Sequence, residues 1–298
     1  MAVGLNTGII QLYDDGFNLI NTFQAHTSAV IRIRQLPNGY VGTCGDLTVK
    51  LWDPTNNWSL IATYTGHTLS LFDLAYINTT LMSSATRGQV HIWSTITLTA
   101  VRIITTSSDG LSLLYNGYLA GGNTYNLNIW DINTGNVIST LTGHTLLPSD
   151  IKSNGALILA SAGDDQKVII WDLATYTLKY TLTGHTSNVE GLVFITPNIL
   201  ASASYDMTIK LWDVTNGILI RTLTGHTSVI QYAIDAFNSS ILITGSNDQT
   251  VKVWDVNTGV VLMTVATGTP VECLGVIGNY GSRLKYISEL DKVKAEIT

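Results

Sequence analysis

Short apolar runs alternate with turn-forming residues along the chain, and their order repeats. Residues 181–213 read TLTGHTSNVEGLVFITPNILASASYDMTIKLWD: a Gly-His pair, two apolar runs separated by Pro-Asn, a polar Tyr-Asp turn and a last apolar run ending in Trp-Asp. Apolar-rich runs of about four to eight residues bounded by Gly, Pro, Asn and Asp are typical of β-strands. The pattern therefore predicts an all-β chain built from repeated groups of short strands.

The repeat has a period close to 40 residues. Seven units end in an aromatic residue, at Tyr13, Trp52, Trp93, Trp130, Trp171, Trp212 and Trp254, and successive markers are 39, 41, 37, 41, 41 and 42 residues apart. Asp follows the marker in six units, and Ser94 follows it in the third. The hexapeptide TLTGHT occurs three times, beginning at Thr140, Thr181 and Thr222. A fixed period of about 40 residues indicates a repeat architecture.

These motifs resemble those of the WD40-repeat family, and the resemblance extends over essentially the whole chain. In the sixth unit, 21 residues separate His185 from Asp206 and 6 separate Asp206 from Trp212, and the fifth unit repeats both offsets. The resemblance implies an all-β fold, a seven-bladed β-propeller whose blades are four-stranded antiparallel sheets. It also implies one domain over residues 1–298, with 289–298 as a candidate short tail.

The chain begins inside a unit. Ala2–Leu5, Ile9–Tyr13 and residues 19–23 read as three strands, one fewer than a blade needs. The missing strand can only come from residues 271–277, which follow the last Trp-Asp pair. We therefore expect the N- and C-terminal strands to share one blade, which removes open sheet edges that would otherwise template aggregation.

Histidine, hydroxyl, aspartate and tryptophan recur together in the three most regular units. The resemblance implies hydrogen-bonded structural tetrads with these members: His144, Ser161, Asp165 and Trp171; His185, Ser202, Asp206 and Trp212; His226, Thr244, Asp248 and Trp254. A Ser-His-Asp set can also be catalytic, but an active site is needed once, whereas this set recurs. Gly42, Arg87, Thr106 and Thr124 occupy tetrad positions in units two to four, which we expect to be the softer blades.

Composition argues against several functional classes. Charged residues make up 12% of the chain, the net charge is −6, and Lys and Arg are scattered, so no basic stripe is available for nucleic acid or an anionic membrane. No apolar run reaches the ~18 residues that cross a bilayer, and the first residues lack the features of a secretory signal. We therefore expect a cytoplasmic monomer that binds neither nucleic acid nor membrane.

The chain offers no cofactor or metal motif. Cys44 and Cys273 have no metal-binding spacing. Five of the six histidines occupy one position in five different units, too far apart to share an ion. The sixth, His91, stands alone in a predicted strand, where a packed or solvated side chain is expected. We predict no cofactor, no metal and no catalytic residue.

Specific function is expected at residues that do not repeat, on the rim of the central channel. The resemblance implies partner-binding positions three and five residues after the repeated histidine and just before the turn aspartate. The predicted partner-binding residues are Ile31, Phe72, Leu147, Asp164, Asn188, Glu190, Tyr205, Val229, Gln231 and Asn247. Apolar and aromatic groups beside acids suggest a peptide with one apolar anchor and one basic residue. No arginine occupies these positions, which argues against recognition of phosphorylated peptides.

Three functional hypotheses follow. The first is a non-catalytic protein-protein interaction scaffold that binds a protein or peptide partner on the channel face. The second is a propeller enzyme that uses acidic channel residues such as Asp150, Asp164 and Glu190. The third is a structural repeat segment of a larger multidomain protein. We favour the first, because an enzyme of that kind would gather more acids or histidines at the channel than this chain supplies.

Overall fold

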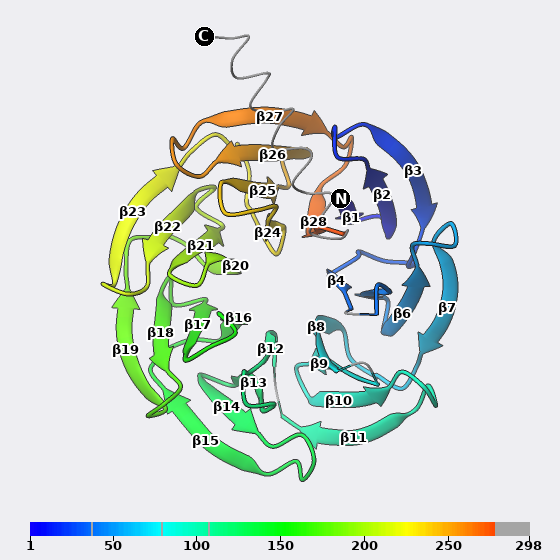
Figure 1. Cartoon of the computed structure of the whole chain (residues 1–298), viewed down its shortest axis with the longest axis vertical. Coiled ribbons are helices and arrows are strands. Elements are labelled where there is room, and N and C mark those ends of the chain that lie inside the picture. The colour runs from blue at the N-terminus through cyan, green and yellow to red at the C-terminus, as the bar shows by residue number, and fades with distance from the viewer. Residues whose placement is uncertain (37, 79, 107, 278–298) are drawn as a thin grey trace.

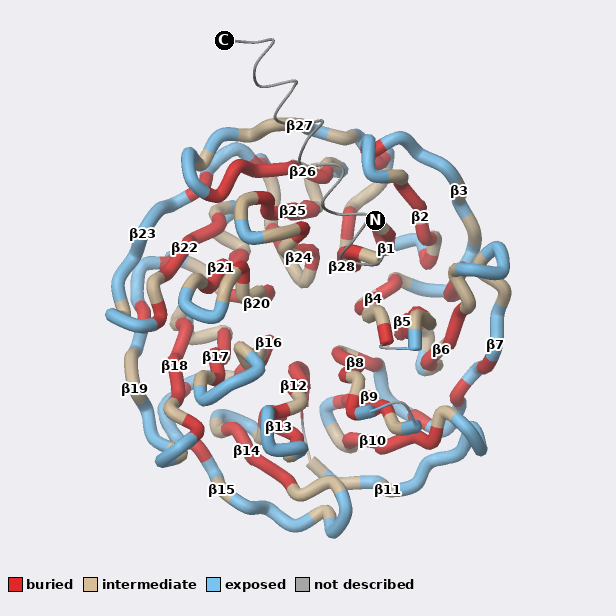
Figure 2. Tube along the Cα trace, in the orientation of Figure 1, coloured by how far each residue is buried: buried red, intermediate tan, exposed pale blue. Residues whose placement is uncertain are grey.

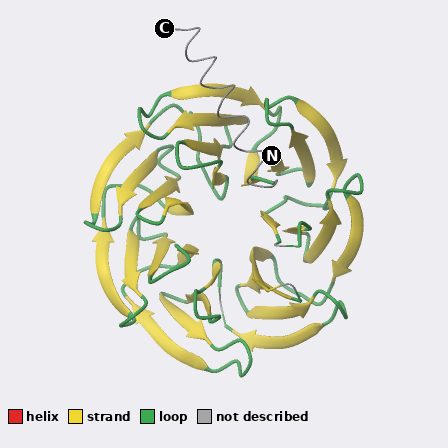
Figure 3. Ribbon diagram, in the orientation of Figure 1, coloured by secondary structure: helices red, strands yellow, loops and turns green. Residues whose placement is uncertain are grey.

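The computed structural model describes residues 1–36, 38–78, 80–106 and 108–277. The described residues form 28 strands in seven four-stranded antiparallel sheets, which stand as blades around a central axis (Figure 1). This part of the chain holds strands and loops without a helix (Figure 3), so no helix in it could cross a membrane. The predicted seven-bladed β-propeller is confirmed.

The strands of each blade run from the channel outwards. Blade one contains β28 (Val271–Gly275), β1 (Ala2–Leu5), β2 (Ile9–Tyr13) and β3 (Leu19–Gln24); blade two contains β4 (Arg32–Gln35), β5 (Val41–Gly45), β6 (Thr48–Asp53) and β7 (Ser59–Tyr64). Blade three contains β8 (Leu71–Asn78), β9 (Leu81–Thr86), β10 (Gln89–Ser94) and β11 (Ala100–Thr105); blade four contains β12 (Leu111–Leu113), β13 (Leu119–Asn123), β14 (Asn126–Trp130) and β15 (Val137–Thr142).

Blades five to seven have the same order. Blade five contains β16 (Pro148–Ser153), β17 (Ile158–Gly163), β18 (Val168–Asp172) and β19 (Thr177–Leu182); blade six contains β20 (Val189–Thr196), β21 (Ile199–Ser204), β22 (Ile209–Asp213) and β23 (Ile218–Leu223). Blade seven contains β24 (Ile234–Ala236), β25 (Ile241–Gly245), β26 (Thr250–Asp255) and β27 (Val261–Ala266).

Blade one closes the ring with strands from both ends of the sequence (Figure 1). β28 pairs antiparallel with β1, with Ala2 opposite Gly275 and Gly4 opposite Cys273. A Cβ on Gly4 would lie 2.5 Å from the Cys273 sulfur, so this close pairing requires glycine. The expectation that terminal strands share one blade is confirmed, whereas the candidate tail at 289–298 lies outside the described residues.

The hydrophobic core lies between neighbouring blades. The inner strands are mostly buried and the outermost strands face solvent (Figure 2), as β21 and β23 of blade six illustrate. Trp254 and Leu242 of blade seven pack with Ala203 and Leu211 of blade six in one cluster. Each blade is therefore stabilised by its neighbours, and the loops at the two faces are free to differ.

Candidate functional site

The three most regular blades contain the same hydrogen-bonded network. In blade six, His185 Nδ1 lies 2.7 Å from Asp206 Oδ2, and His185 Nε2 lies 2.8 Å from Ser202 Oγ. The indole N–H of Trp212 donates to the same hydroxyl oxygen at 2.8 Å. The corresponding distances are 2.7 to 3.0 Å in blade five and 2.8 Å in blade seven. Because its members satisfy one another repeatedly, we interpret this network as scaffolding rather than catalytic machinery.

Blade two contains a complete network, contrary to our expectation. Gly42 does not hold the hydroxyl position. Thr43 holds it, and its Oγ1 lies 2.8 Å from His26 Nε2 and 2.9 Å from Trp52 Nε1. His26 Nδ1 in turn lies 2.9 Å from Asp46 Oδ1. The prediction that unit two lacks a member is therefore wrong.

A short turn in blade two explains the misassignment. One residue fewer separates the hydroxyl from the tryptophan than in blades five to seven, so counting back from the tryptophan overshoots by one position. Asp46 and Leu47 form this turn with φ values of 39° and 68°, the left-handed pair of a type I′ hairpin. Strand pairing is unaffected, with Thr43 opposite Lys50.

Blade three keeps the histidine, serine and tryptophan but not the carboxylate. His67 Nε2 lies 2.7 Å from Ser84 Oγ, and Trp93 donates to the same oxygen at 2.6 Å. Arg87 stands in place of the aspartate, and the buried Nδ1 of His67 has no hydrogen-bond partner. The His67 ring stacks on the buried His91 with centroids 3.9 Å apart, so His91 is a packed side chain, one of the two states expected for it. Burial, followed by the effect of His91, lowers the pKa of His67 to about 4.

Blade four replaces the network with a local arrangement. The Ser108 hydroxyl accepts from Gly122 N at 2.8 Å and donates to Gly110 O at 2.7 Å. A Cβ on Gly121 would lie 2.6 Å from the Trp130 ring and 2.9 Å from this hydroxyl oxygen, so the close packing requires glycine. Thr106, near the histidine position, has a buried hydroxyl without a hydrogen-bond partner. Neither residue reproduces the histidine–carboxylate pair of the regular blades.

A buried ion network crosses the channel. Arg32 Nε donates to Asp73 Oδ1 at 3.0 Å, and Arg32 Nη2 lies 3.7 Å from Asp150 Oδ1. The guanidinium also lies over the Tyr232 ring, 3.7 Å from its centroid. These contacts join blades two, three, five and seven through one side chain. Sequence reasoning missed the network, although Arg32, Asp73 and Asp150 each stand six residues after the histidine of their unit.

The Asp150 carboxylate bonds to other members of this network and to backbone N–H groups. Its carboxylate accepts the N–H groups of Ile151 at 3.0 Å and Leu192 at 2.8 Å, and Lys152 also donates to it. Burial would raise the pKa of Asp73, but Arg32 lowers it below its usual value. The Asp73 carboxylate therefore carries a charge inside the ring that Arg32 balances. Across the described ranges, no group of three or more His, Cys, Asp or Glu side chains could hold a metal ion.

One arginine reaches the channel rim from outside the predicted positions. Arg87 forms a bidentate pair with Asp109 at 2.6 to 3.0 Å. Its guanidinium also lies 4.6 Å from the centre of the Phe72 ring. Because Asp109 already neutralises it, Arg87 does not provide the free cationic cluster that a phosphorylated ligand needs.

Two further acids lie on the same rim, and in the described part of the chain neither forms an ion pair. Glu190 is 5% exposed, and burial, followed by the Asp164 carboxylate, raises its pKa to about 7. Burial likewise raises the pKa of Asp164, which accepts the Asn188 amide at 2.8 Å. Nearby, Gln231 Nε2 donates to the Tyr205 hydroxyl at 3.1 Å. A cation placed here would stabilise the charged form of both acids.

The structure brings predicted partner-binding residues together in pairs. The N–H groups of Asp164, Tyr205 and Asn247 donate to the carbonyls of Leu147, Asn188 and Val229 at 3.0, 2.9 and 3.1 Å respectively. Each pair joins the loop that enters a blade to the turn between its second and third strands. These loops and turns lie at the same end of the strands, and we call this surface the channel face.

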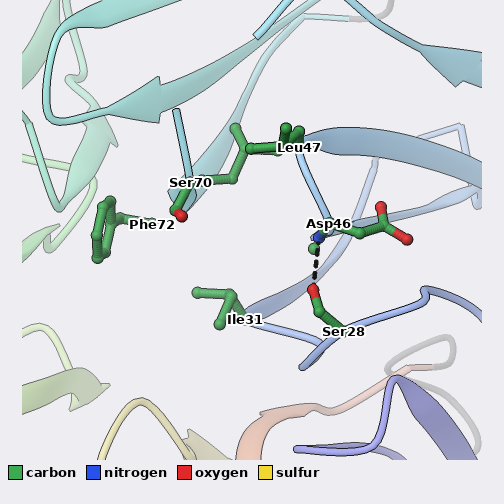
Figure 4. Close-up of a pocket in the computed structure, with 8 residues that line it drawn as sticks. Ser28, Ile31, Asp46, Leu47, Ser70 and Phe72 are labelled. Atoms are coloured by element: carbon green, nitrogen blue, oxygen red, sulfur yellow. Dashed lines mark hydrogen bonds between the residues drawn. The ribbon is translucent and has the colours of Figure 1, made fainter. Parts of the chain in front are cut away.

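A pocket of about 430 Å³ opens on the channel face between blades two and three (Figure 4). Its lining residues are Ser28, Ile31, Gly45, Asp46, Leu47, Ser70, Leu71 and Phe72. The Asp46 carboxylate points away from the pocket (Figure 4) and accepts the Thr27 N–H, which leaves apolar walls. Ile31 and Phe72 were predicted to bind a partner. Leu47 was missed, because the position after the turn aspartate was not among those that the family resemblance implied.

Comparison with known proteins finds one family model and distant relatives. The model described as "WD domain, G-beta repeat" matches residues 17–53, 135–172, 176–213 and 217–255, just over half of the chain. The chain is 30% identical over 171 residues to "Nuclear distribution protein PAC1" of Arthroderma otae, which covers 55% of this chain and 31% of that protein. It is 34% identical over 107 residues to "Nuclear distribution protein nudF" of Aspergillus niger, which covers 33% of this chain and 24% of that protein. The chain thus spans less than a third of the length of either relative.

Proposed function

Because the chain belongs to the WD40-repeat family, we propose that it is a non-catalytic scaffold that binds a protein or peptide partner on its channel face. One contrast on that face carries the proposal. The repeated polar networks are mutually satisfied, whereas the pocket at Ile31 and Phe72 opens on the face, and the acids Asp164 and Glu190 have a neutral amide beside them rather than a basic partner among the described residues. Apolar pockets beside a few polar groups are the usual components of a binding site.

The proposal extends to the state of the protein. We propose one domain over residues 1–298, monomeric and cytoplasmic, without a nucleic-acid, membrane or cofactor partner. Cys44 and Cys273 are buried free thiols, as suits a reducing compartment, and the net charge of −6 disfavours binding to phosphate backbones. A dimeric mass in light scattering, or recovery with the membrane fraction of a cell lysate, would contradict this part.

The enzyme alternative loses most of its support at Asp150, whose carboxylate is bound by two N–H groups and Lys152. One observation favours the enzyme alternative. Burial raises the pKa of Glu190 to about 7, and a carboxyl with such a pKa could serve as a general acid. The experiment must therefore measure turnover as well as binding. The multidomain alternative is tested separately, by sequencing the full-length transcript.

Affinity purification with the whole chain as bait tests the proposal. The Phe72→Ala/Tyr205→Ala variant should lose the captured partners. Tyr115→Ala is a matched control, because this exposed tyrosine lies in the turn between β12 and β13, on the opposite face. Unchanged partners in the double variant, together with turnover of a substrate panel that Glu190→Gln abolishes, would replace the scaffold by the enzyme.

A further inference from the structure

We infer that the channel face binds an extended peptide that inserts an apolar side chain into the pocket between blades two and three and places a lysine or arginine beside Asp164 and Glu190. This assignment rests on the proposed function. It specifies which side chains of the partner are recognised and in which direction the peptide crosses the channel face. Three features of the face support it: the origin of the pocket, its proximity to the acids, and the excess of acidic groups.

The pocket exists because blade two lacks a side chain that its counterparts have. The residue that precedes the turn aspartate in blades five to seven, Asp164, Tyr205 or Asn247, has no counterpart in blade two, because the turn there is one residue shorter. Gly45 does not supply this side chain, because it stands two residues after the network hydroxyl, as Gly163 does in blade five, and a Cβ there would lie 2.6 Å from Ala29 O and 2.9 Å from the His26 ring. The space that a side chain fills in the regular blades is therefore open here.

Leu47 gives this space an apolar wall that faces solvent. The equivalent residues of blades five to seven are Gln166, Met207 and Gln249, and all share its left-handed conformation, with φ between 66° and 68°. Leu47 is 43% exposed, and Figure 4 shows it across the pocket from Ile31. A branched apolar residue in a strained turn conformation, and half exposed, is more easily explained by a partner that covers it than by packing inside the blade.

Phe72 connects the pocket to the acids. It lines the pocket and lies against the Arg87 guanidinium, which Asp109 holds in place. Arg87 and Asp109 both act electrostatically on Asp164, and Asp164 acts on Glu190. The pocket and the acids therefore lie within electrostatic range of one another around the channel, and Asp164 of blade five contacts blade six through the Asn188 amide at 2.8 Å.

Acidic groups outnumber basic groups on this surface, and this excess favours the binding of a cation. Four acidic side chains, those of Asp109, Asp164, Glu190 and Glu272, lie around the channel face with one guanidinium, that of Arg87, which pairs with Asp109. Deeper in the channel, Arg32, Arg34 and Lys152 are held by Asp73 and Asp150. The carboxylates outnumber the basic groups, so a lysine or arginine would be attracted and an acidic or phosphorylated peptide repelled.

A peptide panel with the whole chain tests this assignment. Each fluorescein-labelled, C-amidated octapeptide carries one leucine and one lysine in a Gly/Ser background, and the panel varies their spacing and order. Matched peptides carry leucine alone, lysine alone, or leucine with glutamate. We expect at least one leucine–lysine peptide to bind at least about fivefold more tightly than each matched peptide, measured by fluorescence anisotropy at ~50 mM salt.

Two variants with matched controls assign the two ends of the peptide. Leu47→Asn suits the left-handed turn and should weaken the best peptide by about fivefold or more, whereas Met207→Asn, with the same 43% exposure, should not. Glu190→Gln should remove the preference for lysine over glutamate. Asp15→Asn, which removes an exposed charge from the turn between β2 and β3 on the opposite face, should preserve that preference.

The outcomes separate this assignment from the proposed function. A panel without a leucine–lysine preference, or equal losses in the variants and their controls, overturns the assignment. If Phe72→Ala/Tyr205→Ala still loses captured proteins in that case, the scaffold function stands and only the peptide chemistry is rejected. Tighter binding of the leucine–glutamate peptides would likewise reject the cation.

Discussion

Blades six and three carry the same fold and use their polar residues differently. In blade six, both nitrogens of His185 have partners, Asp206 and Ser202, and the network closes within the blade. In blade three, the residue at the aspartate position is Arg87, which leaves His67 Nδ1 without a partner and reaches Asp109 instead.

Among the residues that the structure describes, Arg87 takes no part in a hydrogen-bonded network within its own blade, and its side chain therefore reaches the channel face. Blade two shows the same relation in another form, because its network is complete but its shortened turn exposes Leu47 beside Gly45. The family model matches the repeats that contain the networks of blades two, five, six and seven. We infer that regular positions hold the ring together, and that departures from the repeat build its binding surface.

The largest effect is expected at the ion network that joins regular and irregular blades. Arg32→Leu would leave Asp73 and Asp150 without the arginine between them, and breaking a buried ion pair costs about 3–5 kcal/mol. We expect the free energy of unfolding, measured in urea, to fall by that amount. Arg32→Leu/Asp73→Leu removes both charges and should recover part of the loss. A loss below about 1 kcal/mol in the single variant would instead be typical of a solvated pair.

Acidification should single out blade three. The pKa of His67 is lowered from 6.5 to about 4 in the folded protein, so the unfolded chain binds a proton first. The stability contributed by neutral His67 is therefore complete above about pH 6.5 and is lost as the pH falls toward 4. We expect a loss on the order of 2 kcal/mol, below the full value of the shift because the ring keeps some contact with solvent.

Urea titrations between pH 7.5 and 4 measure this loss, and His67→Gln should flatten the profile. Aspartates in the regular networks, such as Asp206, also have lowered pKa values, but their contribution is lost only below their ordinary pKa of about 3.9. A His67→Gln profile parallel to that of the wild type would assign the pH dependence to His26 and His226, whose pKa values burial also lowers.

Blades that lack part of the hydrogen-bonded network should open locally more often than blades with a complete network. β9 and β13, in the blades without the histidine–carboxylate pair, should exchange amide hydrogens at least about tenfold faster than β21. β5 should resemble β21, because the Thr43 network is complete. Hydrogen exchange read by mass spectrometry separates these segments. Equal protection of β9 and β21 would mean that the His185–Asp206 pair adds little to the stability of its blade.

The sequence predicted the parts of this molecule that repeat. The tryptophan spacing was enough for seven blades, and the shortage of strands near Ala2 was enough to place residues 271–275 beside β1. Contacts across the ring could not be predicted that way, because Arg32 meets Asp150 more than a hundred residues away in the sequence. The pocket was also hidden, since it depends on a turn that is one residue shorter in blade two than in blades five to seven.

The smallest effect is expected at Leu47, where it bears most directly on the contrast between regular and irregular blades. Asparagine tolerates the left-handed conformation better than leucine, so Leu47→Asn should raise the free energy of unfolding by about 0.5 kcal/mol. Met207→Asn should give a similar gain, because Met207 has a φ of 67° against 68° at Leu47 and the same exposure. Equal gains in urea denaturation would show that the fold does not need the leucine. If Leu47→Asn alone destabilises the protein, Leu47 packs within its own blade, and the pocket beside it is a consequence of folding rather than a place for a partner.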